Sequence, residues 1–225
     1  MMIFFDIDDT LTDSESAHKQ AIHNLFSNYC MKVDPDAVFS KWMEITSKYL
    51  ALYFEDKISL EEQRAARIKE IFMMSGQQIQ NEEALILYDN YHRDFLQSCI
   101  VFPETIPVLE MLKDIRLGII TNGPVADQTE KLRSNKLTDY FDPIIISEEV
   151  GFAKPKVEIF RAAAQAARHP LPECIFVGDS YEYDYLGGVA AGMKTIWLDR
   201  KRAMHLPESE SIHSLLELPG YLQIK

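Results

Sequence analysis

The 225-residue chain is poor in cysteine and in positive charge, and it has no long apolar run. Its three cysteines, Cys30, Cys99 and Cys174, are widely spaced without a CxxC pair, which argues against a disulfide framework and against a zinc site. No apolar run approaches the ~20 residues that a membrane-spanning helix needs. The 23 lysine and arginine residues face 35 aspartate and glutamate residues, a formal net charge of -12, so a nucleic acid polymer or an anionic membrane would be repelled.

The first residues of the sequence indicate in which cellular compartment we expect the protein. The apolar run Met1–Phe5 meets Asp6 at once, which is too early for a signal peptide with its apolar stretch of about 7–15 residues. We therefore expect a cytoplasmic protein. An apolar fraction of 47% with 26% charged residues is typical of a globular protein of one or two domains.

The first hundred residues change from one strand to a helical pattern. Met2–Asp6 (MIFFD) is a short apolar run that ends in an acid, which is typical of a buried strand leading into a catalytic loop. From about Ser14 to Ser98 the pattern is wholly helical. Ser59 and Glu62 form a capping-box signature, and Asn81 is a good N-cap for a later helix.

One face of the helical segment carries large apolar side chains. Val38, Trp42, Ile45, Tyr49 and Tyr53 follow one another at helical spacing. Its three ring-bearing members, Trp42, Tyr49 and Tyr53, could stack on a nucleobase, but this spacing is more typical of core packing. We therefore expect them to pack in the core.

After Pro103 short apolar runs alternate with helical patterns. The expected strands are Leu117–Thr121, Ile144–Ser147, Cys174–Gly178 and Thr195–Leu198. The expected helices are Glu104–Ile115, Ala126–Asn135 and Lys156–Ala167. Short apolar strands separated by helices indicate a parallel sheet covered on both faces. The sequence thus predicts a doubly wound, Rossmann-like α/β domain from residues 1–13 and 99–225, with an all-helical insert at 14–98.

Polar side chains follow the predicted strands at the points where they end. In an open α/β sheet ligands bind beyond the carboxyl ends of the strands, so these side chains should meet in one crevice. Clustered carboxylates need a compensating cation; a lysine supplies one charge, and oxygen ligands without histidine or cysteine favour Mg²⁺. The candidate site residues are Asp6, Asp8, Thr121, Asn122, Gly123, Lys154, Asp179 and Asp184.

The motif order DxDxT, TN, KP and GDSxxxxD resembles the haloacid dehalogenase superfamily of aspartate-dependent phosphohydrolases, including a helical cap between the first and second motifs. The resemblance implies that Asp6 is a nucleophile that becomes an aspartyl-phosphate. It implies that Asp8 is the general acid and base, with its backbone carbonyl on the metal.

The resemblance also implies how substrate and metal are held. Thr121, with Asn122 and Gly123, would bind the phosphoryl oxygens, and Lys154 would neutralise charge between nucleophile and phosphate. Asn122 could act through its side chain or only through its backbone. The implied Mg²⁺ ligands are Asp6, Asp8, Asp179 and Asp184. For Asp184 the alternative is that it only orients a bound water or Lys154.

Residue differences within the superfamily separate its activities. Haloacid dehalogenases lack the second aspartate because halide needs no proton donor, so Asp8 argues against that activity. The segments TNGPVADQTEKLRSNKLTDYFD, IIISEEVGFAKPK and ISLEEQRAARI resemble bacterial pyrimidine 5′-nucleotidases, from which Pro124 and Lys156 depart. We expect a phosphatase of a small phosphorylated metabolite, with nucleoside 5′-monophosphates favoured. The alternatives are phosphoglycolate or a sugar phosphate as substrate, a phosphonate hydrolase, a sugar phosphomutase, and a catalytically silent phosphate-binding module.

Overall fold

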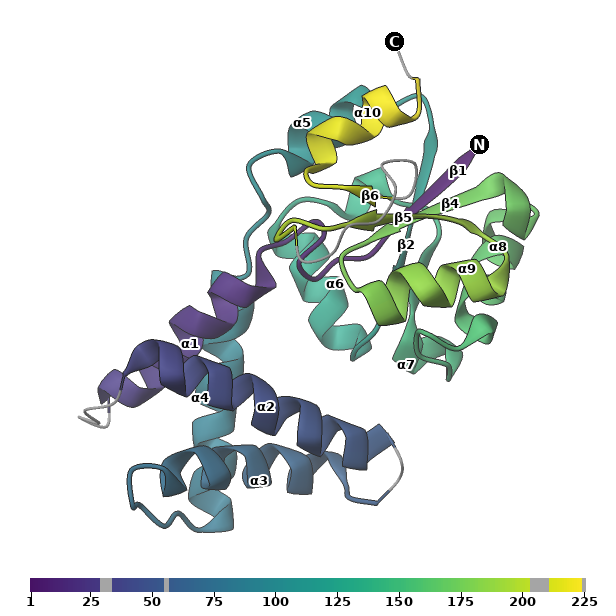
Figure 1. Cartoon of the computed structure of the whole chain (residues 1–225). Helices are drawn as coiled ribbons and strands as arrows, with labels where there is room; N and C mark the ends of the chain where they lie inside the picture. The colour runs from purple at the N-terminus through teal and green to yellow at the C-terminus, as the bar shows by residue number, and fades with distance from the viewer. Residues whose placement is uncertain (29–33, 55–56, 203–210, 224–225) are drawn as a thin grey trace. The chain divides into compact units, whose positions relative to one another are not determined.

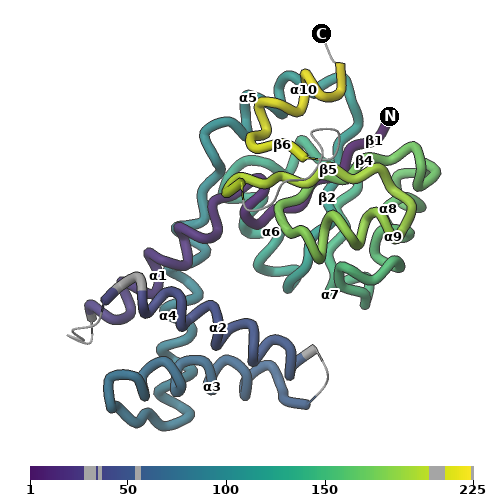
Figure 2. Tube along the Cα trace, viewed as in Figure 1, coloured from purple at the N-terminus to yellow at the C-terminus, as the bar shows by residue number. Residues whose placement is uncertain are grey.

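The computed structural model describes residues 1–28, 34–54, 57–202 and 211–223 (Figures 1 and 2). Its contacts divide the chain into two compact units, Met1–Asp13 with Ile100–Lys225, and Ser14–Cys99. The sequence assigned Cys99 to the first unit, whereas it lies in the second, where its Sγ is 3.4 Å from the Ser14 hydroxyl. Cys30 lies outside the described residues. None of the helices found among the described residues has the length and apolar character needed to cross a membrane.

A parallel sheet of six strands forms the centre of the first unit. Its order is β3-β2-β1-β4-β5-β6, and every pair of neighbours is parallel. The strands are β1 (Met2–Phe5), β2 (Arg116–Thr121), β3 (Ile144–Ile146), β4 (Cys174–Gly178), β5 (Lys194–Leu198) and β6 (Ser211–Ile212). This topology confirms the doubly wound α/β prediction. Of the six strands that the structure describes, β6, two residues long, is the one that was not predicted.

The two faces of the sheet can be followed along β1. Because successive strand side chains point to opposite faces, Ile3 and Phe5 join one buried cluster, whereas Met2 and Phe4 join another. Packed on the first face are α5 (Thr105–Met111), α6 (Val125–Ser134) and α10 (Leu218–Tyr221). Packed on the second are α8 (Val157–Ala167) and α9 (Gly187–Ala191).

Several short helical turns connect these elements. They are α7 (Ser147–Val150), η1 (Thr138–Tyr140), η2 (Leu171–Glu173), η3 (Tyr181–Leu186) and η4 (Leu215–Glu217). The helix expected over Glu104–Ile115 is shorter than predicted and ends at Met111. Turns follow it, because the Ile115 N–H donates to the Leu112 carbonyl at 2.8 Å, three residues back, instead of continuing the α-helical pattern.

The second unit consists of helices, as the sequence predicts for this segment. They are α1 (Ser14–Asn28), α2 (Pro35–Phe54), α3 (Leu60–Met73) and α4 (Asn81–Ser98). The capping box of α3 is present, with the Glu62 N–H 3.1 Å from Ser59 Oγ and the Ser59 N–H 2.7 Å from Glu62 Oε2. The prediction that Asn81 caps α4 is wrong. Asn81 is the first residue inside the helix, and its side-chain oxygen accepts a hydrogen bond from Lys69 instead.

The large apolar stripe of α2 packs in the core of this unit. Trp42 is fully buried, its ring centroid lies 4.5 Å from that of Tyr91, and its indole N–H donates to the Tyr91 hydroxyl at 2.9 Å. Core packing is therefore confirmed for Trp42. Tyr49 and Tyr53 are half-buried, and the Tyr49 hydroxyl donates to Glu70 at 2.8 Å.

Trp42→Ala should destabilise the helical unit. Removing a buried tryptophan costs about 3–5 kcal/mol, here with the loss of a hydrogen bond to Tyr91 as well. Hydrogen exchange read by mass spectrometry should show faster exchange across Ser14–Cys99. The neighbouring variant Met43→Ala, which removes a 40% exposed side chain, is the matched control. Equal exchange in the two variants would contradict this packing.

Candidate active site

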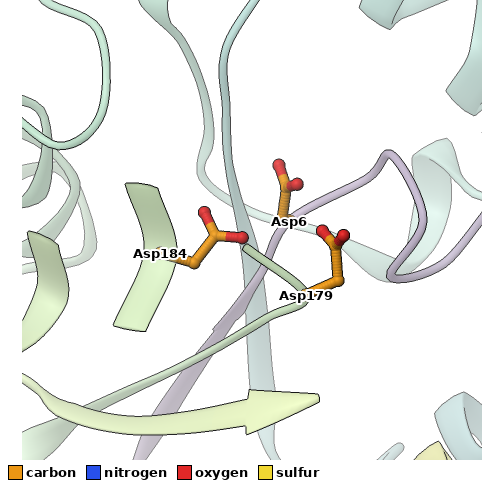
Figure 3. A group of neighbouring side chains, drawn as sticks. All are labelled: Asp6, Asp179 and Asp184. Atoms are coloured by element: carbon orange, nitrogen blue, oxygen red, sulfur yellow. The ribbon is translucent and has the colours of Figure 1, made fainter. Parts of the chain in front are cut away.

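Three carboxylates gather at the carboxyl ends of β1 and β4, where the direction of strand order reverses (Figure 3). Asp6 directly follows β1, and its N–H donates to the Val177 carbonyl at 3.0 Å, which extends the pairing of β1 with β4. Asp179 directly follows β4, and Asp184 comes from η3. One oxygen from each carboxylate lies within 4.8 Å of those of the other two.

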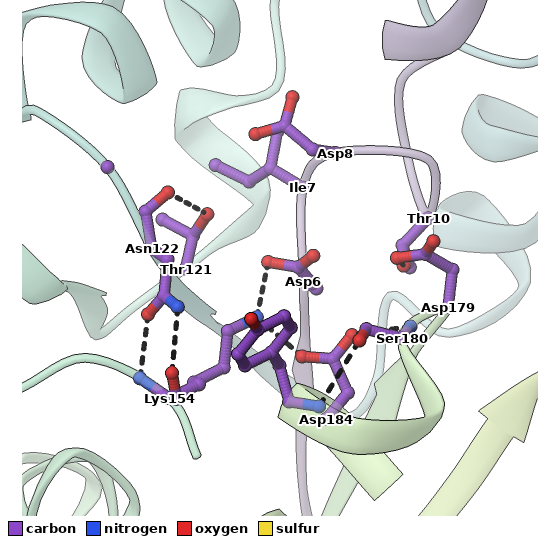
Figure 4. Close-up of polar contacts among 12 residues, drawn as sticks. Asp6, Ile7, Asp8, Thr10, Thr121, Asn122, Lys154, Asp179, Ser180 and Asp184 are labelled. Carbon is purple, nitrogen blue, oxygen red and sulfur yellow. Dashed lines mark hydrogen bonds and ion pairs between the residues drawn. The ribbon is translucent and has the colours of Figure 1, made fainter. Parts of the chain in front are cut away.

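Lys154 supplies the positive charge of this acidic cluster, which consists of Asp6, Asp179 and Asp184. Its Nζ lies 2.7 Å from Asp6 Oδ1 and 2.6 Å from Asp184 Oδ1, and its side chain is only 3% exposed (Figure 4). The ammonium also lies 5.3 Å from the ring centroid of Phe176, which packs beneath it. Of the two roles considered for Asp184, an ion pair with Lys154 is therefore present.

Two further hydrogen bonds fix the Asp184 carboxylate and the backbone of Asp179. The Ser180 N–H donates to Asp184 Oδ2 at 2.9 Å, and the Trp197 indole N–H donates to the Asp179 carbonyl at 2.8 Å. A Cβ at Gly178 would collide with the Asp184 carboxylate, so glycine is the residue that lets η3 approach β4 this closely.

Burial is the largest influence on the pKa values of these groups, and neighbouring charges add to it or oppose it. Burial raises the pKa of Asp6 to about 7, with Lys154 opposing and Asp184 adding to the shift. Burial likewise raises the pKa of Asp179 to about 9, together with the neighbouring carboxylates of Asp6 and Asp184. Burial alone would lower the pKa of Lys154, but Asp184 and Asp6 outweigh it and hold that pKa above its usual range.

The acidic cluster fits a hard divalent cation. Three carboxylates face one ammonium, which leaves two negative charges when all are ionised. The ligands that this cluster offers are all carboxylate oxygens, the donors that Mg²⁺ prefers. The ligand predicted from Asp8 is its backbone carbonyl, and that prediction is separate from the position of its side chain. The Asp8 carboxylate is not in this group and is directed away from Asp179 and Asp184 (Figure 4).

The loop after β2 is engaged mainly in holding its neighbours. Thr121 is buried at the end of β2. The Asn122 side chain binds the backbone of Lys154 twice, accepting from its N–H at 2.8 Å and donating to its carbonyl at 3.0 Å. The Gly123 N–H donates to Ser147 Oγ at 3.0 Å, which joins this loop to the start of α7. The contact of Gly123 with phosphate stays a prediction.

Two residues of α6 that the sequence did not single out contact Asp8. Lys131 Nζ lies 2.6 Å from Asp8 Oδ1, and Gln128 Nε2 lies 3.0 Å from Asp8 Oδ2. Their spacing of three positions on the helix following TNG was a signal that could have linked them to one another. No sequence pattern indicated that Asp8 was their partner.

The fold and the site define a doubly wound α/β protein with an acidic cluster at the switch point of its parallel sheet. The comparisons with known proteins agree. The family model of haloacid dehalogenase-like hydrolases matches residues 1–192. The chain belongs to the haloacid dehalogenase-like hydrolase family, as its motifs predicted.

Several similar proteins act on phosphate esters, according to their names. The chain is 31% identical to pyrimidine 5′-nucleotidase YjjG of Escherichia coli, over 98% of this chain and 96% of that protein. It is 31% identical to glyceraldehyde 3-phosphate phosphatase of Pyrococcus abyssi, over 87% and 80% of the two chains. It is 29% identical to mouse N-acylneuraminate-9-phosphatase, over 98% and 93%.

Solved structures share the fold over almost the whole chain. The putative HAD-hydrolase YfnB from Bacillus subtilis, solved with bound magnesium, has a TM-score of 0.84 at 25% identity and covers 99% of this chain and 98% of its own. The L-2-haloacid dehalogenase from Xanthobacter autotrophicus has a TM-score of 0.77, covering 99% and 98%, but at 14% identity this likeness concerns the fold alone.

The raised pKa values of Asp6 and Asp179 predict how stability depends on pH without metal. Both acids hold their protons in the folded state up to about pH 7 and about pH 9, whereas the unfolded chain releases them near pH ~4. Their contribution to the free energy of unfolding is full below pH ~4 and is lost as the pH rises through about 7 for Asp6 and about 9 for Asp179. The free energy of unfolding in EDTA should therefore decrease from pH ~4 to about pH 9.

Urea unfolding in EDTA at a series of pH values measures this dependence. In Asp179→Asn the free energy of unfolding should decrease less with rising pH than in the wild type. The control is Asp139→Asn, which removes an exposed carboxylate of η1 and should keep the wild-type dependence on pH. Added Mg²⁺ should restore most stability at the alkaline end, where the ligands are ionised. A wild-type slope that Asp179→Asn leaves unchanged would contradict the prediction.

Proposed function

We propose that this protein is a Mg²⁺-dependent phosphomonoesterase that works through an aspartyl-phosphate on Asp6. The observation that carries the proposal is the placement of Asp6 at the switch point of the sheet, in contact with buried Lys154, while Asp8 two residues on is held by separate donors. Two neighbouring acids in different surroundings suit two different roles in one reaction.

Asp6 is the proposed nucleophile. One of its oxygens forms a bond to phosphorus as the ester P–O bond breaks, and the Lys154 ammonium offsets the repulsion between carboxylate and phosphate. Asp6, Asp179 and Asp184 would hold Mg²⁺, together with the backbone carbonyl of Asp8. Bound Mg²⁺ supplies further positive charge to the phosphoryl oxygens.

Asp8 is the proposed general acid and base. It gives a proton to the leaving oxygen of the ester in the first half of the reaction. In the second half it takes a proton from the water that attacks phosphorus, which releases phosphate and returns Asp6 to its carboxylate. A haloacid dehalogenase needs no such group, so Asp8 favours a phosphatase. Thr121, with the backbone of the loop that follows it, is the proposed contact to the phosphoryl oxygens.

Nucleoside 5′-monophosphates, with pyrimidine bases favoured, are the proposed substrates. The 31% identity to a pyrimidine 5′-nucleotidase over 98% of the chain supports this choice. The names of the glyceraldehyde 3-phosphate and N-acylneuraminate 9-phosphate phosphatases favour a sugar phosphate as the second candidate. The helical unit Ser14–Cys99 is the proposed cap that sets this choice and keeps water from the reaction.

Asp6→Asn and Asp6→Ala should both lose turnover while the fold is kept. The carboxylate that forms the phosphoenzyme is absent from both variants, and removing a nucleophile removes the covalent route. Phosphate release and the thermal unfolding midpoint should be measured for each. Turnover by Asp6→Ala would contradict the role of Asp6 as nucleophile.

A panel of phosphomonoesters tests the substrate. Phosphate release should be measured with Mg²⁺ and with EDTA for pyrimidine and purine 5′-monophosphates, phosphoglycolate, sugar phosphates and p-nitrophenyl phosphate. We expect release that depends on metal, with the highest kcat/KM for UMP, dUMP or dTMP. If a sugar phosphate has the highest kcat/KM, the proposed substrate is wrong, whereas the proposed phosphatase chemistry is supported. No release from any ester would contradict the phosphatase proposal and favour a mutase or a silent binding module.

A further inference from the structure

The Asp8 side chain is fixed from one helix at both of its oxygens. Lys131 and Gln128 lie three positions apart on α6, so they share a face of the helix. The Lys131 ammonium, whose side chain is 4% exposed, contacts Oδ1 at 2.6 Å, and the Gln128 amide contacts Oδ2 at 3.0 Å. A buried ammonium is costly without a partner, and the Asp8 carboxylate provides one.

The same glutamine ties Asp8 to the loop after β2. Gln128 Nε2 donates to the Asn122 carbonyl at 2.9 Å as well as to Asp8. Because both neighbours are oxygen acceptors, the amide nitrogen and not the oxygen must face them. Asn122 in turn binds the backbone N–H and carbonyl of Lys154. A chain of direct contacts therefore runs from Asp8 to the lysine that pairs with Asp6.

Gly123 leaves room for this arrangement. Its φ of +137° lies in the region that side chains disfavour, and a Cβ there would lie 2.7 Å from Gln128 Nε2. The loop is thus shaped around the Gln128 amide.

We propose that Lys131 and Gln128 are positioning residues that hold the Asp8 side chain at the reacting ester and join it to the loops that carry Asn122 and Lys154. The inference rests on the proposed function, in which Asp8 transfers the proton. A carboxylate oxygen can accept two hydrogen bonds, so the contacts to α6 leave room for a reacting oxygen. Proton transfer needs its group within hydrogen-bond reach of the reacting oxygen, and holding both Asp8 oxygens restricts the rotation of the side chain.

Two substrates that differ in their leaving group test whether Lys131 and Gln128 position Asp8 for proton transfer. An alkyl phosphate, the best ester of the panel, needs a proton on its leaving oxygen, whereas p-nitrophenolate leaves readily without one. Lys131→Met and Gln128→Met should lower kcat for the alkyl ester by up to about 10²-fold, with KM little changed and with a much smaller loss for p-nitrophenyl phosphate. Asp8→Asn should show the same preference for the better leaving group.

A double mutant separates action through Asp8 from general damage. Residues that work through one group are not additive, so Lys131→Met should cost little further in an Asp8→Asn background. Arg133→Met is the matched control: it removes another cation of α6, one that is 71% exposed and pairs with Glu130, and it should keep wild-type kcat for both esters. Thermal unfolding establishes that each variant is folded. If Lys131→Met does not fold, Gln128→Met is used for the same test.

Equal losses for the two esters, a change confined to KM, or full additivity with Asp8→Asn would overturn the inference. These outcomes require an active wild-type protein, so they leave the proposed function intact. A wild-type protein that hydrolyses no ester contradicts the proposed function itself, and the positioning role with it.

Discussion

The Lys154 ammonium, buried between Asp6 and Asp184, is the contact on which the rest of the site depends. Like charges within a few ångströms of one another repel strongly in a poorly hydrated environment, and three carboxylates meet here. Removing one partner of such an ion pair leaves a buried charge without compensation, which destabilises more than the pair itself stabilises. The position of this one amine therefore has to be fixed from several directions.

The loops around Lys154 provide that restraint. Asn122, after β2, holds the backbone of Lys154 at its N–H and its carbonyl, and the Phe176 ring of β4 lies beneath the ammonium. The strand ends thus converge on a lysine that belongs to none of them. Asp8, although only two residues from Asp6, is paired with a second buried lysine on α6. Separate cations keep the two neighbouring acids in distinct surroundings.

The fold was largely predictable because its signals are local. Buried parallel strands appear as short apolar runs, and their acidic or polar final residues mark the edge where a site forms. The residues of the acidic cluster followed from this pattern together with the motif order. The end of α5 and the N-cap of α4 did not follow from it. The local sequence marks neither the hydrogen bonds three residues back that follow α5 nor the contact of Lys69 with the Asn81 side chain.

The contacts of Asp8 were beyond the reach of the sequence for a different reason. Lys131 and Gln128 lie more than a hundred residues from Asp8, and a lysine and a glutamine on a helix are ordinary surface residues. Only the packing of α6 on the sheet turns them inward. Trp197 was predicted as part of a strand, but its bond to the Asp179 carbonyl, which joins β5 to the loop after β4, was not.

That bond has a spectroscopic consequence. The chain contains two tryptophans, and the structure places one in each unit, Trp42 in the helical core and Trp197 against Asp179. The emission of an indole depends on the hydrogen bond of its N–H and on nearby charge. In a protein with Trp42 replaced by phenylalanine, the remaining indole is bonded to a residue of the acidic cluster. A change in its emission on adding Mg²⁺ would report binding there without any turnover.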